Sequence, residues 1–299
     1  MLNYAMTNIN KIILFFIILV LHSFNSFAGG IFWEIKSKNN INHKATVYLL
    51  GSIHMATDEL YPMPKEIDVA FSNSDYLVLE LDISKINPIE MQKKMILDGG
   101  KTIDNLLSEN LINKLENEFS NFGMKKSEWM RLRPWAAVLI LTQKILMRDG
   151  LNPDLGIDFH YLMESIKDGQ EILELESFEL QMETFARLDS FPDSYIDYSL
   201  ESLHEGKKMI DNMIKAWKKG DTLAISKILW DEESQKIERY DDLLKIMLDE
   251  RNVGMTKKIE EYINSDKTYF VIVGAGHLLG EKGILQLLQN TKKYNILKK

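Results

Sequence analysis

The chain has 299 residues, of which 44 are acidic and 36 are basic, so its net charge is −8 and nucleic acid is an unfavourable partner. It contains no cysteine, which excludes disulfides and a lipid-modified cysteine at a signal cleavage site. With 45% hydrophobic and 27% charged residues, the composition is that of a folded protein rather than a disordered one.

The first 28 residues have the pattern of a cleavable signal peptide. One charge, Lys11, precedes the apolar run Ile12 to Leu21, which is about half the roughly 20 residues that a membrane-spanning helix needs. Ser26 and Ala28 are small residues at the positions that signal peptidase reads. We therefore expect cleavage after Ala28, a periplasmic or secreted mature protein, and no stable membrane span. An uncleaved anchor is the alternative.

The first predicted strands follow at once. Two apolar segments separated by a polar stretch, Ile31 to Ile35 and Thr46 to Gly51, predict a β-hairpin. Pro64 can open a helix from Lys65 to Phe71, because proline is tolerated at the first helical position. A third strand is expected at Tyr76 to Leu81.

The middle of the chain, from Pro88 to Ser265, is predicted to be helical apart from a short strand at Glu171 to Leu175. The expected helices run from Pro134 to Met147, Gly156 to Lys167, Ser177 to Leu188, Asp193 to Lys219, Asp221 to Trp230 and Ser234 to Glu250.

A second group of strands closes the chain. Thr268 to Gly274 is apolar on both faces, as expected of a strand in the middle of a sheet. A helix from Leu278 to Leu288 and a short strand near Tyr294 to Leu297 follow. The sequence therefore predicts an α/β (α+β) fold, with one domain over residues 29–299. Its mixed β-sheet comes from both chain ends and carries a large helical insertion.

The predicted helix from Asp193 to Lys219 carries a stripe of aromatic and methionine side chains, including Tyr195, Met213 and Trp217. Such a stripe can line a groove for a peptide, since these side chains adapt to varied apolar ligands. Core packing is the plainer interpretation.

Two Gly-x-x-His turns are the first candidates for chemistry. Gly51 to His54 and Gly274 to His277 each follow an apolar strand that ends in glycine. Glycine permits a sharp exit from the strand, and the histidine then lies at the carboxyl end of the sheet, where α/β folds usually bind ligands. Histidines that only stabilise turns are the alternative.

Glu80 is the third candidate. A carboxylate within the apolar run Val78 to Leu81 is costly unless it is paired or binds a cation. Together with His54 and His277 it would complete a ligand set for Zn²⁺, Mn²⁺ or Co²⁺ with open positions for water. A glutamate that simply faces solvent is the alternative.

These motifs resemble the TraB/GumN family, which includes pheromone-shutdown proteins and the Tiki metalloproteases. The resemblance rests on Val47 to Met55, Tyr61 to Pro64, Val78 to Glu80, Arg251-Asn252 and Phe270 to Gly280. It implies a fold like that of erythromycin esterase and the haem-binding ChaN-like proteins. From the Tiki branch it implies divalent-metal-dependent peptide cleavage, with His54, Glu80 and His277 as metal-site or catalytic residues.

Four other polar residues fit this interpretation. Arg251 resembles the family's arginine and could clamp a carboxylate or stabilise an oxyanion, and Arg133 is a similar but separate candidate. Asp158 and Glu176 resemble family acids that could orient a histidine. For all four, an ordinary structural role is the alternative, as caps, ion-pair members or solvated helix residues.

The remaining histidines are weaker candidates for a functional site, and three common enzyme motifs are absent from the sequence. His43 and His204 are expected at the surface, and His160 does not share a helix face with Asp158, because residues two apart diverge. The sequence has no HExxH zinc helix, GxSxG elbow or GxxxxGK[ST] phosphate loop.

Three functional hypotheses remain. The first is an exported hydrolase acting on a peptide or other amide or ester substrate, in which His54, Glu80 and His277 hold a divalent ion and Arg251 stabilises negative charge. The second is a protein that binds a peptide or small ligand without turnover. The third is metal-free catalysis, with a histidine as general base and Glu80 as its partner.

Overall fold

A computed structural model describes residues 29–38, 45–191, 193–232 and 234–299. The predicted signal peptide and His43 lie outside these ranges. None of the helices within them is both long enough and apolar enough to cross a membrane.

A six-stranded mixed sheet forms the centre of the fold. Its strand order is β4-β3-β5-β2-β1-β6. The strands are β1 (Phe32–Ser37), β2 (Thr46–Ser52), β3 (Tyr76–Leu79), β4 (Glu171–Glu174), β5 (Thr268–Gly274) and β6 (Tyr294–Lys298). The predicted hairpin is confirmed, since β1 pairs antiparallel with β2. The sheet does join the two ends of the chain, as the sequence predicts.

Four neighbouring strands, β4, β3, β5 and β2, are parallel, so their carboxyl ends meet at one edge. The register makes these ends nearly level: Ser52 at the end of β2 pairs with Gly274 at the end of β5, and Leu79 at the end of β3 pairs with Ile272. The residues that follow these strands therefore emerge close together.

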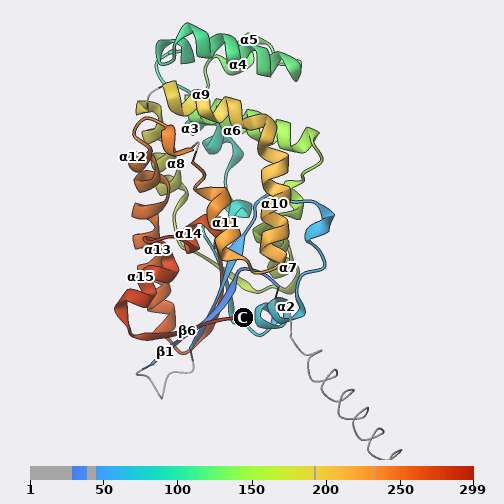
Figure 1. Cartoon of the computed structure of the whole chain (residues 1–299), viewed down its shortest axis with the longest axis vertical. Coiled ribbons are helices and arrows are strands. Elements are labelled where there is room, and N and C mark those ends of the chain that lie inside the picture. The colour runs from blue at the N-terminus through green and yellow to red at the C-terminus, as the bar shows by residue number, and fades with distance from the viewer. Residues whose placement is uncertain (1–28, 39–44, 192, 233) are drawn as a thin grey trace, which may run out of the picture.

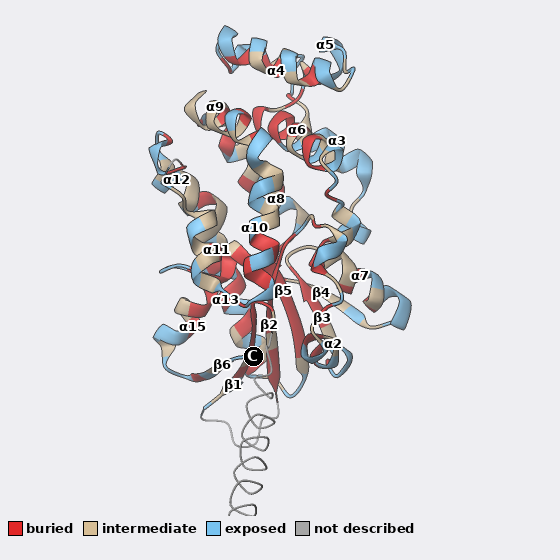
Figure 2. Cartoon of the chain, turned by 45° about the vertical axis from the view of Figure 1, so that its right-hand side comes forward, coloured by how far each residue is buried: buried red, intermediate tan, exposed pale blue. Residues whose placement is uncertain are grey.

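Helices cover both faces of the sheet (Figure 1). On one side lie α2 (Lys65–Ser72) and α7 (Ile157–Asp168), and on the other lie α13 (Glu250–Ile263) and α15 (Ile284–Thr291). Because β5 has neighbours on both edges and helices on both faces, its residues from Tyr269 to Gly274 are buried (Figure 2). This apolar strand positions the Gly274 turn.

Most of the inserted helices form a cap beyond the carboxyl ends of the parallel strands (Figure 1). The cap has its own apolar cluster, which includes Leu115, Trp129 and Leu141 and is separate from the cluster around the sheet. Its helices are α3 (Pro88–Met95), α4 (Glu109–Asn121), α5 (Lys126–Trp129), α6 (Pro134–Arg148), α8 (Phe178–Arg187) and α9 (Asp193–Ser202). Two further helices, α10 (Gly206–Lys218) and α11 (Thr222–Leu229), connect the cap to the sheet. The chain then continues through α12 (Tyr240–Leu244) and a π-helical turn (Lys245–Asp249) into α13.

Several predicted elements have different bounds. The helix predicted from Ser234 to Glu250 is interrupted, because a short turn ends at Lys236 and α12 begins only at Tyr240. The third strand ends at Leu79, so Glu80 follows the strand and does not lie within it. The helix predicted from Asp193 to Lys219 is divided at Leu203–Glu205, where Gly206 packs so closely against α6 that a Cβ atom would lie 2.9 Å from Leu146. The expected stripe is core packing, because Met213 and Trp217 are both buried.

The last helix also begins later than predicted. A short helix, α14 (Ala275–Leu278), holds His277, and α15 begins only at Ile284. Gly280 between them adopts a left-handed conformation with φ of 87°, which side chains other than glycine rarely adopt. The predicted fold class is nonetheless confirmed: a mixed sheet built from both chain ends with a large helical insertion.

Candidate functional site

The three principal candidates converge over Gly274. A Cβ atom placed on Gly274 would lie 3.2 Å from His54 Nε2, 3.4 Å from Glu80 Oε1 and 3.7 Å from His277 Cδ2. His54 follows β2, Glu80 follows β3, and His277 lies in α14 directly after β5. Glycine at position 274 thus leaves room for all three side chains at the carboxyl edge of the sheet, which is where the two Gly-x-x-His turns lead one to expect them.

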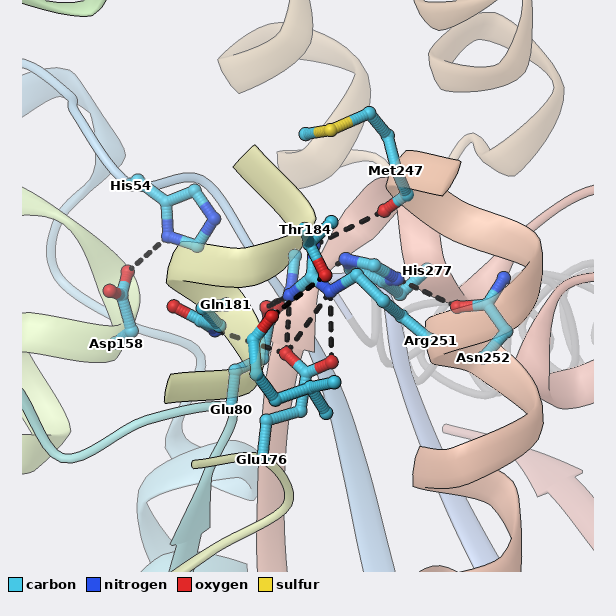
Figure 3. Close-up of polar contacts among 12 residues, drawn as sticks. His54, Glu80, Asp158, Glu176, Gln181, Thr184, Met247, Arg251, Asn252 and His277 are labelled. Atoms are coloured by element: carbon cyan, nitrogen blue, oxygen red, sulfur yellow. Dashed lines mark hydrogen bonds and ion pairs between the residues drawn. The ribbon is translucent and has the colours of Figure 1, made fainter. Parts of the chain in front are cut away.

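Asp158, at the start of α7, orients His54. His54 Nδ1 lies 3.1 Å from Asp158 Oδ1 (Figure 3). The same carboxylate accepts a 2.6 Å hydrogen bond from the hydroxyl of Ser52. Gly156 allows the approach of the two segments, because a Cβ atom there would lie 2.4 Å from the carbonyl oxygen of His54. With Nδ1 held by Asp158, His54 Nε2 is the ring nitrogen that points toward Gly274.

Asn252, in the first turn of α13, orients His277 in an analogous way. The Asn252 amide nitrogen donates to the carbonyl oxygen of Lys282 at 3.0 Å, which leaves its Oδ1 as the atom that faces His277. That oxygen lies 2.6 Å from His277 Nδ1 (Figure 3). Since Oδ1 can only accept, Nδ1 must carry the proton, and in a neutral ring Nε2 keeps its lone pair. That nitrogen lies 3.7 Å from Glu80 Oε2.

Glu80 belongs to a buried network centred on Arg251. Its Oε1 accepts a hydrogen bond of 2.6 Å from the backbone N–H of Gly274, and its Oε2 accepts a hydrogen bond of 2.7 Å from Arg251 Nη2. Arg251 also donates to Glu176 through Nε and Nη2, at 2.6 to 3.1 Å, and to the carbonyl of Met247 through Nη1 (Figure 3). Gln181 on α8 donates to Glu176 at 3.0 Å. The network satisfies an otherwise costly pair of buried carboxylates.

The two histidines have opposite pKa shifts. The carboxylate of Asp158 raises the pKa of His54 to about 9. Burial lowers the pKa of His277, and this outweighs the opposite effect of Glu80. Burial alone would raise the pKa of Glu80, but His277, Arg251 and His54 hold it below its ordinary value. At neutral pH the site thus combines a protonated His54, a neutral His277 and an ionised Glu80.

These residues line a cavity of about 270 Å³. His54 lies at its edge, with 62% of its side chain exposed, whereas the side chains of His277 and Arg251 are buried. The rest of the wall is mostly apolar and comes from the segment after β3, from α7 and from α8. Apolar walls around a few convergent polar groups are typical of ligand-binding sites.

The structure separates the other sequence candidates from this cavity. Arg133 instead pairs with Asp189 at 2.6 Å in the cap, and His204 pairs with Glu118 at the surface. His160 packs against Tyr61 and Tyr161. Two candidates are exceptions: Asp158 contacts His54 directly, and Glu176 contacts Arg251 directly, although a structural role is the plainer interpretation of both from sequence.

Sequence reasoning assigns no role to Asn252, Gln181 or Ser52. For Asn252 one signal exists: it follows Arg251 in the segment that resembles the family motif. For Ser52 the signal is its place within the turn from Gly51 to His54, whereas no local pattern distinguishes Gln181 from surface polar residues.

The described part of the chain contains no set of three or more histidine, aspartate or glutamate side chains already arranged to hold a metal ion. Both Glu80 oxygens accept hydrogen bonds, one from Arg251 and one from Gly274. The donor atoms suited to a divalent ion are nevertheless present, as His54 Nε2, His277 Nε2 and the Glu80 carboxylate.

Together, fold and site define a class of mixed α/β proteins with two strand-end histidines and a carboxylate–arginine pair at the carboxyl edge of the sheet. The chain belongs to the TraB/PrgY/gumN family, which it matches over residues 31–294.

Two relatives illustrate the range of this family. The chain is 24% identical to "Uncharacterized protein YbaP" of Escherichia coli (strain K12), with 81% of this chain and 87% of the relative covered. It is 23% identical to "Metalloprotease TIKI homolog" of Amphimedon queenslandica, with 91% of this chain and 62% of the relative covered. No solved structure matches the chain, so the expected likeness to the erythromycin esterase fold is untested.

Proposed function

We propose that this protein is an exported, metal-dependent hydrolase that cleaves a peptide or another amide or ester bond. The observation that carries the proposal is the paired anchoring of the two histidines. Asp158 and Asn252 hold the Nδ1 atoms of His54 and His277, so that both Nε2 atoms lie beside Glu80, where the one on His54 can bind once its proton is displaced. Proteins hold metal-binding histidines in this way, with the second ring nitrogen donating to a carboxylate or carbonyl group.

Two imidazoles and a carboxylate suit Zn²⁺, Mn²⁺ or Co²⁺. His54 and His277 would bind through Nε2, and Glu80 would bind while it still accepts from Arg251 and Gly274. When bound, such an ion polarises the scissile carbonyl and lowers the pKa of a bound water toward ~7. The similarity to a protein named as a metalloprotease supports the same chemistry.

Arg251 would stabilise the negative charge that develops on the substrate oxygen. Its contacts with Glu80, Glu176 and Met247 use both Nη2 hydrogens, the Nε hydrogen and one Nη1 hydrogen. A guanidinium has five N–H groups, so one Nη1 hydrogen has no acceptor within the described part of the chain. Arg251 lines the cavity, and a fixed donor there would stabilise an oxyanion without reorganisation.

A second candidate is metal-free hydrolysis in the same cavity. The hydrogen bond to Asn252 leaves His277 Nε2 as an acceptor that could take a proton from water. The His54–Asp158 pair could return a proton to the leaving group. Two groups whose environments favour opposite protonation states form an acid and base pair suited to such a reaction.

Metal analysis and a chelator separate these candidates. We expect the purified protein to bind about one divalent ion per chain and to cleave members of a mixture of end-capped peptides and chromogenic esters. His54→Ala and His277→Ala should each lose the ion and the activity while remaining folded, as circular dichroism would show. His204→Ala is the matched control, because His204 contacts only Glu118, outside the cavity.

The possible outcomes point in different directions. Activity that resists the chelator but falls in His54→Ala would select the metal-free mechanism. Ligand binding without turnover would select a sequestering protein. If no ion is found and both variants keep wild-type activity, the proposed site is wrong.

Export is part of this proposal and rests on the pattern of residues 1–28. Gly30, just after the predicted cleavage position, is held in the fold, because its N–H donates to the carbonyl oxygen of Trp217 at 3.0 Å. N-terminal sequencing of protein recovered from outside the cytoplasm should begin at Gly29. Recovery of the intact N-terminus in the membrane fraction would contradict cleavage.

A further inference from the structure

Part of the cavity wall is apolar. The wall contains the histidines, Glu80 and Arg251 as polar groups, and it also contains a set of apolar side chains, called the apolar half below, that includes Leu81, Ile83, Phe159 and Phe185. Ile83 is the most unusual of these, because 49% of it is exposed. A single exposed isoleucine is ordinary. An isoleucine that forms part of a cavity wall beside reactive groups is a surface that an apolar ligand would cover.

The segment carrying Ile83 is firmly held. The buried carboxylate of Asp82 accepts two hydrogen bonds from Ser84, one from the backbone N–H at 3.1 Å and one from the side-chain hydroxyl at 2.6 Å. It also forms an ion pair with Lys85 at 3.0 Å. The Asp82 N–H donates to Glu174 at 2.8 Å. These contacts fix the short helical turn Ile83–Lys85 directly after Glu80, so the position of Ile83 is determined by the same segment that places the Glu80 carboxylate.

The wall formed by α8 is equally well supported. Phe185 stacks on Trp135, with ring centroids 5.1 Å apart and an interplanar angle of 20°. Trp135 is buried in the cap cluster, so the cap fixes the position of the Phe185 ring. On α8, Gln181 lies one helical turn before Phe185 and donates to Glu176. The helix therefore presents a polar contact to the Arg251 network and an aromatic surface to the cavity.

Charge and size restrict what this half can accept. Each charged side chain of the cavity wall has a partner of opposite sign: His54 with Asp158, and Glu80 with Arg251. No excess charge remains to attract an ionic side chain. The volume of about 270 Å³ lies just below the roughly 300–1,000 Å³ typical of sites for drug-sized ligands. It suits one large side chain together with the bond beside it.

We infer that this apolar half is a specificity subsite for an uncharged apolar side chain, of the size of leucine or phenylalanine, next to the scissile bond. The inference rests on the proposed hydrolase function and adds a substrate class to it. Ile83, Phe159 and Phe185 form the subsite, and Ile83 is the residue whose exchange disturbs the fold least, because half of it contacts solvent.

A set of end-capped peptides that differ at one position tests the subsite. The varied residue is glycine, alanine, leucine, phenylalanine, aspartate or lysine, and cleavage of each peptide by the purified protein is followed by mass spectrometry. We expect leucine and phenylalanine peptides to be cleaved about 10-fold to 100-fold faster than glycine or aspartate peptides, the range that differences in apolar contact produce.

Two substitutions at Ile83 make the test specific. Ile83→Asp should reduce the preference for leucine over glycine to less than threefold, because a carboxylate replaces apolar wall. Ile83→Trp should shift the preference toward alanine by filling the space. Ile89→Asp is the matched control: Ile89 is 63% exposed, lies in the first turn of α3 six residues further on, and is not among the residues that line the cavity. It should keep the wild-type profile.

The outcomes separate the subsite from the proposed function. Turnover with no apolar preference, or an unchanged profile in both Ile83 variants, overturns the subsite and leaves the hydrolase intact. If no peptide is cleaved, the same peptides with a fluorescent label are measured for binding by polarisation. Tighter binding of the leucine peptide that Ile83→Asp abolishes supports the subsite and rejects the hydrolase. Equal binding of the leucine and aspartate peptides overturns the subsite.

Discussion

Asn252 in α13 contacts both the ring of His277 and the backbone of Lys282. Only 2% of Asn252 is exposed, and its amide group joins the ring of His277 to the carbonyl oxygen of Lys282. It therefore controls both the direction of the ring and the nitrogen that carries the proton. A role of this kind affects ligand binding without contact between Asn252 and the ligand.

Asn252→Ala should weaken metal affinity by about 10-fold to 100-fold, the usual effect of removing such a partner. It should also lower stability by about 1–3 kcal/mol, because the Lys282 carbonyl loses its donor. Metal titration and denaturant unfolding measure the two effects, and ¹⁵N NMR of His277 reports the tautomer. Asn264→Ala is the control, since that amide donates to the carbonyl oxygen of Glu260 at the exposed end of the same helix. An unchanged tautomer and affinity in Asn252→Ala would contradict the role.

Asp158 determines the charge of His54 in the metal-free protein. The raised pKa of His54, about 9, means that this ring is protonated at neutral pH. The resulting stability is fully present below the unfolded pKa of about 6.5 and is lost as pH rises through 9. Because a metal must displace the proton, metal affinity should increase with pH over the same range.

Asp158→Asn should bring the pKa of His54 down toward its ordinary value and flatten this pH dependence. NMR titration of the ring in the presence of a chelator measures the pKa directly. Asp154→Asn removes the same charge four residues earlier and should leave the titration unchanged, because no contact joins Asp154 to His54. A titration of His54 that is identical in Asp158→Asn and wild type would show that the ion pair is not formed.

Among the structural elements, the end of β5 is the one on which the site depends most. Gly274 has an ordinary negative φ of −51°, so its backbone conformation would accept any residue. A larger residue is disfavoured because its side chain would contact the side chains of the site. The space above it is filled by His54 and Glu80. Any side chain would displace the groups that the strands bring together.

Gly274→Ala should therefore reduce turnover while changing the unfolding temperature little. The new Cβ atom would lie 3.2 Å from His54 Nε2, so the ring must shift by a few tenths of an ångström. Activity assays and thermal unfolding check this pair of results. Gly254→Ala in α13 is the matched control: nothing lies within 4 Å of its Cβ position, so it should keep activity and add about 0.4–1 kcal/mol of stability. Full activity in Gly274→Ala would show that the active site does not lie at this strand end.

The elements also show what a sequence can and cannot reveal. The turns at His54 and His277 are predictable because each motif is local: an apolar strand, a glycine, then a histidine. The partners are not, because Asp158 is more than 100 residues from His54 and reaches it only through the packing of α7 on the sheet. Likewise, Arg251 meets Glu80 and Glu176 because β3 and β4 are neighbours, an order that strand patterns alone do not specify.

At the scale of the whole molecule, the cavity lies where the sheet layer meets the helical cap. The floor comes from the strand ends of the sheet, and Phe185 contributes the cap side of the wall. The two layers have separate apolar clusters, one around β5 and one around α4 and α6. Separate clusters of this size favour separate cooperative units, which open at different free energies.

A matched pair of core substitutions tests this division. Leu115→Ala in α4 and Leu49→Ala in β2 each remove a completely buried leucine side chain, and each should cost about 2–5 kcal/mol. Hydrogen exchange should then rise mainly in α4, α5, α6 and α9 for Leu115→Ala, while β2, β3 and β5 keep their protection. Leu49→Ala should instead expose the strands. Equal loss of protection in both layers for Leu115→Ala would show that cap and sheet unfold as one unit, and the cap could then not move independently of the strand ends that form the site.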